Sequence, residues 1–258
     1  MAMNLVRAVA TVALALTFAP KQVSATTIRF VTEAYPPLNH LEDGQITGAS
    51  MEQVRLIMKN ADIPYSVEIM PWARALSLGE IEPDICVFST VHNPQRDRNF
   101  KWVEPLIKSR TVLIRKLGST AGPHTLEEAK AYTIGTQRDD FTHDILKSQE
   151  FPKIDVAVNL DLSLKKLLNG RIDLMPVSKS YYDRLKHAGA AVESVLTLTE
   201  SIYAIACNPS VSDATIARMQ QELDRLIQDG TQQRILDAYG VATGDSVSSG
   251  QSRMTRAP

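Results

Sequence analysis

Segments that suit buried β-strands alternate with segments of helical periodicity, and this alternation constrains the fold more than any other feature. In the first half of the chain, Thr27–Thr32 (TIRFVT) is apolar and β-branched, which is typical of a buried strand. Ser50 and Gln53 predict a capping box at the start of a helix, and apolar residues recur at helical spacing over 51–61. Strands separated by helices predict a parallel sheet with helical crossovers. The further segments predicted in this half are strands at 65–70 and 84–89 and a helix at 72–78.

The same alternation starts again after residue 110. Thr125 and Glu128 predict the capped start of one helix, and Ser212 is the expected N-cap of a long amphipathic helix that Gly230 ends. Two α/β units without a Gly/Ser-rich linker indicate two lobes in close contact, and a cleft between lobes is where a small ligand is expected. The predicted strands are 111–115, 132–136, 154–158, 172–176 and 202–207, and the other helices are 140–147, 163–169, 179–186 and 231–239.

Residues 1–25 have the pattern of a secretory signal peptide. Arg7 precedes an apolar run over 8–19, and the small residues Val23, Ser24 and Ala25 suit cleavage. A buried N-terminal helix is the alternative. The prediction is an exported, periplasmic protein that begins near residue 26 and ends in a flexible tail at 245–258, which has few residues to bury.

Composition and motifs argue against several functional classes. The 28 Lys and Arg residues against 29 Asp and Glu give a formal net charge of −1, so no basic excess favours nucleic-acid binding. The sequence contains no G-x-S-x-G, H-E-x-x-H, P-loop or G-x-G-x-x-G motif. Its five histidines lack metal-ligand spacing, so neither a metal nor another cofactor is expected.

Several short motifs, in order along the chain, carry a family resemblance. The segment Ile28–Gly48 (IRFVTEAYPPLNHLEDGQITG) is followed by Asn93-Pro94-Gln95-Arg96, by Phe100–Pro105 (FKWVEP), by Gly170–Asp173 (GRID) and by Tyr203–Ala206 (YAIA). Together they resemble the family 3 periplasmic solute-binding proteins, the receptors of ABC importers for polar amino acids. The P-W-A-R sequence at 71–74 and FKWVEP indicate a divergent branch of that family.

The resemblance implies a type II periplasmic binding protein fold. In such a fold two Rossmann-like α/β lobes are joined by two crossing strands and close around a ligand by hinge bending. Lobe one is expected at 26–107 plus 202–244, and lobe two at 108–201.

By the same resemblance, Arg96 takes the place of the arginine that binds the ligand α-carboxylate. Guanidinium suits this role because it stays charged and can donate two parallel hydrogen bonds to a planar carboxylate. The alternative is a surface salt bridge from Arg96 to Asp97 or Glu104. Ser89 and Thr90 follow the third strand, where hydroxyl and backbone N–H groups of the family bind the same carboxylate, although small polar residues there can also cap a turn.

Two aromatic residues and a second cation complete the candidates that the resemblance places in lobe one. Tyr35 and Trp72 align with aromatic residues that stack on the ligand, and lobe packing is their alternative role. Arg74 either faces the cleft as a second cation or is solvated on its helix.

The chain departs from the family pattern where the ligand ammonium and carboxylate meet lobe two. Ser178 stands where an aspartate usually receives the ammonium, and Asp139 and Asp140 stand where Gly-Thr or Gly-Ser is usual. The two aspartates either cap the following helix or take over the binding of the ammonium. Glu33 is a further acidic candidate near the cleft mouth. These departures weaken the case for a standard zwitterionic α-amino acid as ligand.

The resemblance also places the two cysteines of the chain on neighbouring antiparallel strands. Cys86 lies in the third predicted strand and Cys207 ends the strand at 202–207. A disulfide is possible in an exported protein, and two buried free thiols are the alternative.

The function that follows is capture of a small polar, amino-acid-like solute by a monomer that presents it to an ABC permease. One alternative is an exported enzyme similar to cyclohexadienyl dehydratases, with Asp140 or Glu33 as the general acid. Another is a ligand-binding sensor subunit that docks on the periplasmic domain of a receptor.

Overall fold

The computed structural model describes residues 27–242. The predicted signal peptide at 1–25 and the predicted tail at 245–258 lie outside these residues. None of the helices in the described part has the length and apolar character to cross a membrane.

A six-stranded mixed sheet runs through the whole molecule. Its strand order is β4-β1-β5-β10-β6-β9. The parallel part consists of β1 (Ile28–Thr32) between β4 (Tyr65–Ile69) and β5 (Ile85–Val91). The remaining strands, β10 (Val192–Cys207), β6 (Lys101–Lys116) and β9 (Met175–Ser178), are added antiparallel.

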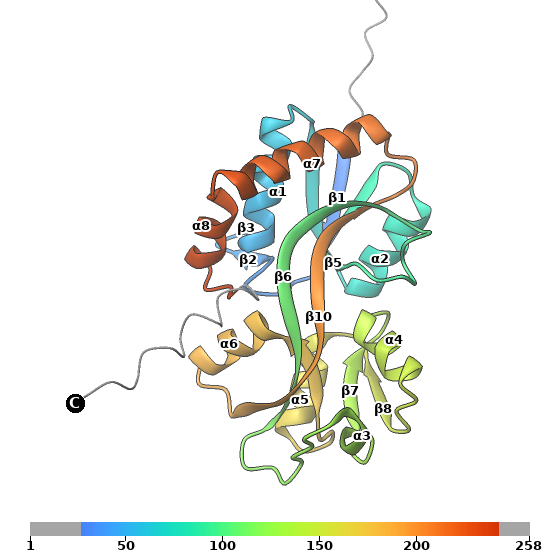
Figure 1. The fold of residues 1–258 in the computed structure, drawn as a ribbon, viewed down its shortest axis with the longest axis vertical. Coiled ribbons are helices and arrows are strands. Elements are labelled where there is room, and N and C mark those ends of the chain that lie inside the picture. The colour runs from blue at the N-terminus through green and yellow to red at the C-terminus, as the bar shows by residue number, and fades with distance from the viewer. Residues whose placement is uncertain (1–26, 243–258) are drawn as a thin grey trace, which may run out of the picture.

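The strands β6 and β10 join two halves of the molecule (Figure 1). Each is 16 residues long and continues from the upper half of the view into the lower half. We call the half around β1, β4 and β5 lobe one, and the half around β7, β8 and β9 lobe two. The predicted architecture of two α/β lobes joined by two crossing strands is therefore observed, and the exact residue limits of the lobes stay a prediction.

Lobe one packs four helices against its part of the sheet. They are α1 (Ala49–Asn60), α2 (Trp72–Ile81), α7 (Asp213–Gln228) and α8 (Thr231–Ala238), and a hairpin of β2 (His40–Glu42) and β3 (Gln45–Thr47) precedes α1. Phe30 and Phe88 from adjacent strands are fully buried and meet edge to face, with 6.2 Å between ring centroids. Their core includes the apolar faces of α1 and α7, as the helical periodicity predicted.

Lobe two is built from shorter elements. The parallel pair β7 (Ile134–Gln137) and β8 (Ile154–Ala157) and the strand β9 are covered by α3 (Leu126–Ala129), α4 (Phe141–Ser148), α5 (Leu160–Leu168) and α6 (Lys179–His187). Each of the four helices has an N-cap residue whose side chain accepts a hydrogen bond from a backbone N–H. In chain order these N-cap residues are Thr125, Asp140, Asn159 and Ser178. Side-chain caps satisfy N–H groups that a helix leaves unpaired at its start.

Several predicted element boundaries differ from the structure, most of all those of β6 and β10, which cover 101–116 and 192–207 instead of 111–115 and 202–207. The capping box at Ser50 does not form, because α1 already starts at Ala49. Its N-cap is Gly48, which has a φ of 121° and no room for a side chain beside the Leu38 carbonyl group. The predicted strand at 172–176 begins only at Met175, because Ile172 is buried against Gly135 instead. The helix predicted from 163 starts at Leu160, after its Asn159 cap.

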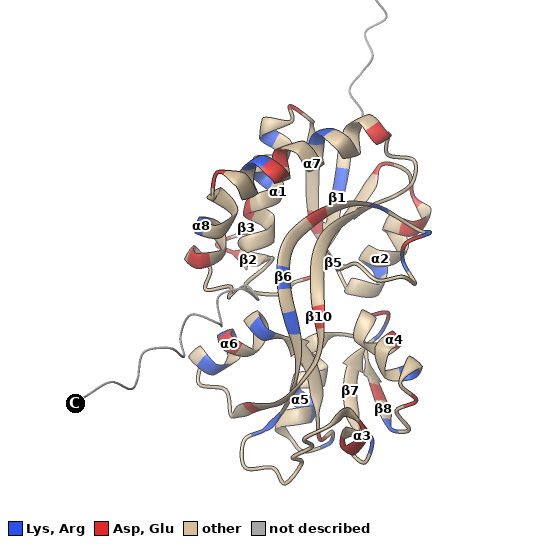
Figure 2. Cartoon of the chain, viewed as in Figure 1, with Lys and Arg blue, Asp and Glu red and all other residues tan. Residues whose placement is uncertain are grey.

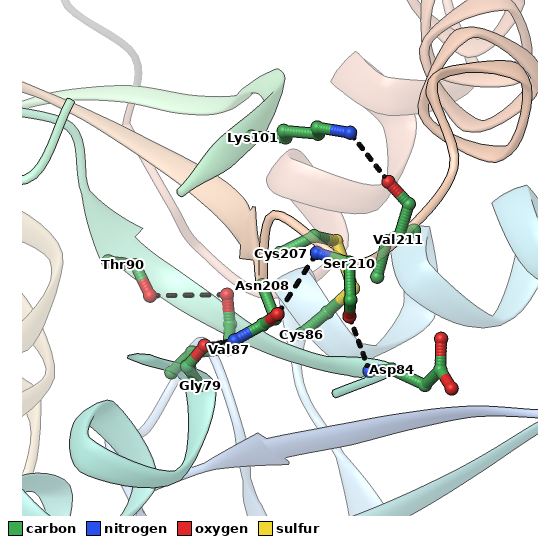
Figure 3. Close-up of a disulfide and its surroundings, with 10 residues drawn as sticks. All are labelled: Gly79, Asp84, Cys86, Val87, Thr90, Lys101, Cys207, Asn208, Ser210 and Val211. Atoms are coloured by element: carbon green, nitrogen blue, oxygen red, sulfur yellow. Dashed lines mark hydrogen bonds between the residues drawn. A yellow bond between two sulfur atoms is a disulfide. The ribbon is translucent and has the colours of Figure 1, made fainter. Parts of the chain in front are cut away.

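The two cysteines form a disulfide within lobe one. Cys207 of β10 pairs in register with Cys86 of β5, and their sulfurs are bonded (Figure 3). Of the two alternatives left open by the sequence, the structure therefore contains the bridge and not the free thiols. It closes a loop that includes all of lobe two, with a sequence separation of 121 residues.

Charged residues of both signs are spread over both lobes (Figure 2). In this view Lys and Arg alternate with Asp and Glu along the helices of each lobe, without an extended basic face. This agrees with the near-neutral composition.

Candidate functional site

A cavity lies between the lobes, and the two crossing strands form part of its wall. Its free volume is about 30 Å³, so in this arrangement the two lobes leave little room between them. Residues from both lobes and from β6 and β10 line it: Thr32, Glu33, Tyr35, Trp72, Ser89, Val91, Arg96, Thr111, Thr136, Gln137, Asp140, Phe141, Thr142, Leu160, Met175, Pro176, Val177, Ser178 and Tyr203.

Arg96 is buried at the cavity, on the turn that connects β5 to β6. Only 4% of its surface is exposed, and its Nη1 donates to the Val91 carbonyl oxygen at 3.1 Å. Its guanidinium carbon lies 5.5 Å from the centre of the Trp72 ring, a cation–π arrangement. Burial lowers the pKa of Arg96, and the nearby Asp140 carboxylate opposes that shift. The predicted alternative, a surface salt bridge to Asp97 or Glu104, is not formed.

The Asp139 carbonyl oxygen connects lobe two to two side chains of lobe one. It accepts hydrogen bonds from Arg96 Nη2 at 3.0 Å and from Trp72 Nε1 at 2.8 Å. Asp139 has a φ of 59°, in the left-handed region that favours glycine, while its side chain is exposed. Asp139 thus takes part through its backbone, and its carboxylate does not line the cavity.

Asp140 does cap the next helix. Its Oδ1 accepts from the Thr142 backbone N–H at 2.8 Å, at the N-terminus of α4. Burial raises the pKa of Asp140, whereas its hydrogen bonds to Thr142 and the Arg96 charge act in the opposite direction. The capping role predicted as one alternative is observed, and the same carboxylate also faces the cavity.

Glu33 is an acidic group in the cavity that has no cationic partner among the contacts of the described chain. Its Oε2 accepts from Gln137 Nε2 of lobe two at 2.9 Å. Burial raises the pKa of Glu33 to about 8, and the hydrogen bond from Gln137 lowers it only in part. Burial therefore favours the protonated form of the Glu33 side chain.

Tyr35 and Ser178 form a further contact between the lobes. The Tyr35 hydroxyl donates to Ser178 Oγ at 3.1 Å and accepts from the Ser178 backbone N–H at 3.0 Å. Ser178 Oγ also accepts from the Tyr181 N–H and so caps α6. Tyr35 packs against Tyr181, with 5.1 Å between ring centroids. Tyr35 thus both connects the lobes and lines the cavity, and its stacking on a ligand stays a prediction.

Of the remaining candidates, Ser89 lines the cavity, and Thr90 and Arg74 do not. Ser89 has a φ of 55° at the irregularity where β5 meets β10, and its hydroxyl donates to Asn39 Oδ1. The Thr90 hydroxyl donates instead to the Val87 carbonyl oxygen at 3.2 Å and is fully buried (Figure 3). Arg74 is exposed, because it lies on the opposite side of α2 from the buried Ala75 and Leu76.

The structure adds residues to the site that sequence reasoning missed. Gln137 ends β7 and reaches Glu33, and Thr111 and Tyr203 enter the cavity from β6 and β10. Burial raises the pKa of Tyr203 above its ordinary value. Asn39 is fully buried and donates to Thr32 Oγ1 at 3.0 Å, which fixes the strand end next to Glu33. Gln137 and Thr111 belong to no quoted motif and carry no sequence signal, whereas Tyr203 opens the YAIA motif and Asn39 lies in the segment 28–48, so these two could have been found from the sequence.

The part of the chain that the structure describes holds no cluster of three His, Cys, Asp or Glu residues arranged to bind a metal ion. The polar residues that line the cavity instead carry one guanidinium, two carboxyl groups, two phenols, one side-chain amide, one indole and six Ser or Thr hydroxyls, and apolar residues lie between them. This mixture suits a small polar organic molecule.

The comparisons with known proteins agree with this geometry. The family model of the bacterial extracellular solute-binding proteins, family 3, matches residues 28–242, so the chain belongs to that family. No curated protein sequence matches it detectably.

Many solved structures share the fold. One is a histidine kinase sensor domain with similarity to periplasmic binding proteins, at TM-score 0.76 and 16% identity over 83% of this chain and 95% of that one. Another is the arginine-, lysine-, histidine-binding protein ArtJ from the thermophilic bacterium Geobacillus stearothermophilus, at TM-score 0.75 and 16% identity over 84% and 96%. A third is the ancestral amino acid-binding protein AncCDT-1, a precursor of cyclohexadienyl dehydratase, at TM-score 0.72 and 17% identity over 83% and 94%. At these identities the likeness shows the fold, which is that of the type II periplasmic binding proteins.

Proposed function

We propose that this solute-binding protein captures a small polar, amino-acid-like solute in the cavity between its lobes and delivers it to an ABC permease. The observation that carries the proposal is the convergence of Arg96, Glu33 and Trp72 from lobe one with Gln137 and Asp140 from lobe two on one cavity. Export by cleavage of residues 1–25 and action as a monomer in the periplasm belong to the same proposal.

Arg96 supplies the site's permanent positive charge. Guanidinium has five N–H donors, and two of the Arg96 nitrogens each use one donor on a carbonyl oxygen. The remaining donors are free to bind a carboxylate of the solute. In a cavity with little water such a charge-assisted pair is stronger than on the surface.

The solute is held from both lobes, which links binding to lobe closure. Trp72 and Tyr35 offer aromatic faces from lobe one, while Gln137 and Ser178 offer polar groups from lobe two. A ligand that contacts both lobes stabilises the closed arrangement by its differential affinity for it.

A thermal-shift panel of amino acids, opines, polyamines and small carboxylates tests the proposal. A compound that binds only the folded protein raises its melting temperature, by an amount that grows with concentration. We expect at least one compound to stabilise the wild type and to lose this effect in Arg96→Met, with the exposed Arg74→Met as matched control. A well-folded wild type that no compound stabilises would contradict the proposal.

The raised pKa of Glu33 favours a second candidate function, an exported dehydratase on the same fold. A protonated carboxylic acid at neutral pH is what a general acid for a leaving hydroxyl requires. Incubation with prephenate or arogenate distinguishes the two functions, since an enzyme releases product and Glu33→Gln abolishes the release. Stoichiometric binding without product excludes the enzyme.

The delivery partner is either an ABC permease or the periplasmic domain of a receptor, as in a sensor system. Binding of the ligand-loaded protein to membranes that carry one or the other partner separates these roles. Because transport needs the permease ATPase, ATP-dependent uptake of the solute identifies the importer.

A further inference from the structure

The turn that carries Arg96 is fastened by a histidine placed between two carboxylates. His92, at the start of the turn, makes a hydrogen bond through Nε2 to Asp97 Oδ1 at 2.5 Å and through Nδ1 to Glu104 Oε2 at 2.8 Å. Asp97 follows Arg96 directly, and Glu104 belongs to β6. The His92 ring therefore links the far end of the turn to a strand that crosses both lobes.

Further contacts fix the histidine and the turn. The His92 ring stacks on the Trp102 indole, with 4.1 Å between centroids and an angle of 16° between planes. Its backbone N–H donates to the Ile202 carbonyl oxygen at 3.0 Å. Within the turn, the Arg96 backbone N–H is shared by the side-chain and backbone oxygens of Asn93, each at 3.0 Å.

We propose that His92, Asp97 and Glu104 form a clamp that positions the Arg96 guanidinium in the cavity. His92 and its two partners do not line that cavity, so they act on the site through the turn and are positioning residues. The inference rests on the proposed function, because the placement of Arg96 matters only if the cavity binds a solute.

The clamp works best with a protonated His92, because only an imidazolium donates from both ring nitrogens. Partial burial lowers the pKa of His92, but the hydrogen bonds to Asp97 and Glu104 outweigh it, so the pKa is raised from its ordinary value. Asp144 of α4 and Glu200 of β10 are the other charged groups that line a surface pocket together with His92. A neutral His92 keeps one N–H and leaves one carboxylate facing a lone pair.

Hydrogen–deuterium exchange of the ligand-free protein tests the clamp. In His92→Asn we expect the amides of residues 92–99 to exchange about tenfold faster than in the wild type, because two partly exposed charge-assisted hydrogen bonds are lost. His124→Asn, which replaces an exposed histidine of lobe two, is the matched control and should exchange as the wild type does.

The pH profile separates positioning from a general loss of stability. The clamp is complete below about pH 6.5, the ordinary histidine pKa, and is lost as the pH rises through the raised pKa of the folded protein. After correction for intrinsic exchange rates, wild-type protection of 92–99 should fall over that rise, and His92→Asn should show no such fall. The Arg96 guanidinium signal in the NMR spectrum, assigned by its loss in Arg96→Lys, should shift over the same pH range.

Equal exchange of 92–99 in the wild type and His92→Asn, or the same pH trend in both, contradicts the clamp. If His92→Asn exchanges faster throughout because it unfolds, Asp97→Asn decides, since that side chain is 54% exposed and its loss leaves the core intact. Faster exchange of 92–99 alone in Asp97→Asn supports the clamp, and unchanged exchange overturns it. These measurements need no ligand, so an absence of solute binding defeats the proposed function without affecting the outcome here.

Discussion

The two lobes contribute to the cavity in different ways. Lobe one supplies long side chains that reach across it, namely Arg96, Trp72, Tyr35 and Glu33. Lobe two meets them with the backbone carbonyl of Asp139, with the helix-capping residues Asp140 and Ser178, and with the Gln137 side chain at the end of β7. Lobe one therefore offers groups whose charge and shape can select a solute, whereas lobe two offers groups already fixed by its own secondary structure.

The hydrophobic cores of the two lobes also differ in size. Lobe one has long helices, a large buried cluster and the disulfide, while lobe two depends on short capped helices around two smaller clusters. A well-packed core under the cavity side chains keeps their positions defined, which binding sites require.

Removal of the disulfide should have the largest effect and should act on lobe one. Opening a loop of 121 residues costs about 4–5 kcal/mol of unfolding free energy in the chain-entropy model. Urea unfolding followed by tryptophan fluorescence measures this, because both tryptophans of the chain, Trp72 and Trp102, lie in lobe one. Reductant should lower the wild-type midpoint and leave the double variant Cys86→Ala/Cys207→Ala unchanged. A wild-type urea midpoint that does not change when reductant is added would contradict this prediction.

Loss of the Arg96 contact across the cleft should come next. Arg96→Met leaves the carbonyl oxygens of Val91 and Asp139 without their charged donor, and we expect a loss of about 2 kcal/mol of unfolding free energy. The matched control Arg74→Met removes an exposed arginine and should change stability by less than about 0.5 kcal/mol. Equal losses of unfolding free energy in Arg96→Met and Arg74→Met would show that the hydrogen bond from Arg96 to the Asp139 carbonyl oxygen does not stabilise the protein.

Glu33 should make the stability of the protein fall with rising pH. Its pKa is about 8 in the folded state against 4.5 for the ordinary group, so between these values the folded protein binds the extra proton and stability decreases as the pH rises. Unfolding at pH 5 and pH 8 should show a smaller decrease for Glu33→Gln than for the wild type. Glu42→Gln, at an exposed position of the hairpin, should behave as the wild type. An identical pH dependence in all three proteins would refute the assignment.

The contact between Tyr35 and Ser178 should give the smallest effect. We expect Tyr35→Phe to cost about 1 kcal/mol by loss of the two hydrogen bonds across the lobes. Ser178→Ala keeps the bond from its backbone N–H but also removes the cap of α6, so it should cost somewhat more. A double-mutant cycle measures the coupling, and strictly additive losses would mean that the hydroxyls do not interact.

Local sequence signals predicted most of lobe one and the helices of lobe two. The apolar spacing of α1 and α7 and the caps at Thr125 and Ser212 are short-range features, and they form as predicted. The full length of β6 and β10 was not predictable, because Lys108, Arg110 and Glu200 give these strands a polar middle. There the pairing between the two strands, and not side-chain pattern, sets the structure.

The site was predictable only in part. Arg96, Tyr35 and Trp72 line the cavity at positions that the family resemblance indicated, and their role in binding stays a prediction, whereas the cavity-lining side chains of Gln137 and Thr111 were missed. The acceptor that Arg96 and Trp72 share is the main-chain oxygen of Asp139, and a carbonyl group is present at every position of a sequence. Only the left-handed turn at Asp139 aims it at lobe one.

Native mass spectrometry of the protein purified from cells tests the central claim, that the cavity between the lobes holds one small solute through Arg96. The account predicts one bound small molecule per chain in the wild type and in Arg74→Met, and none in Arg96→Met. The same adduct on folded Arg96→Met, or a folded wild type that carries none and takes up none of the panel compounds, would contradict it.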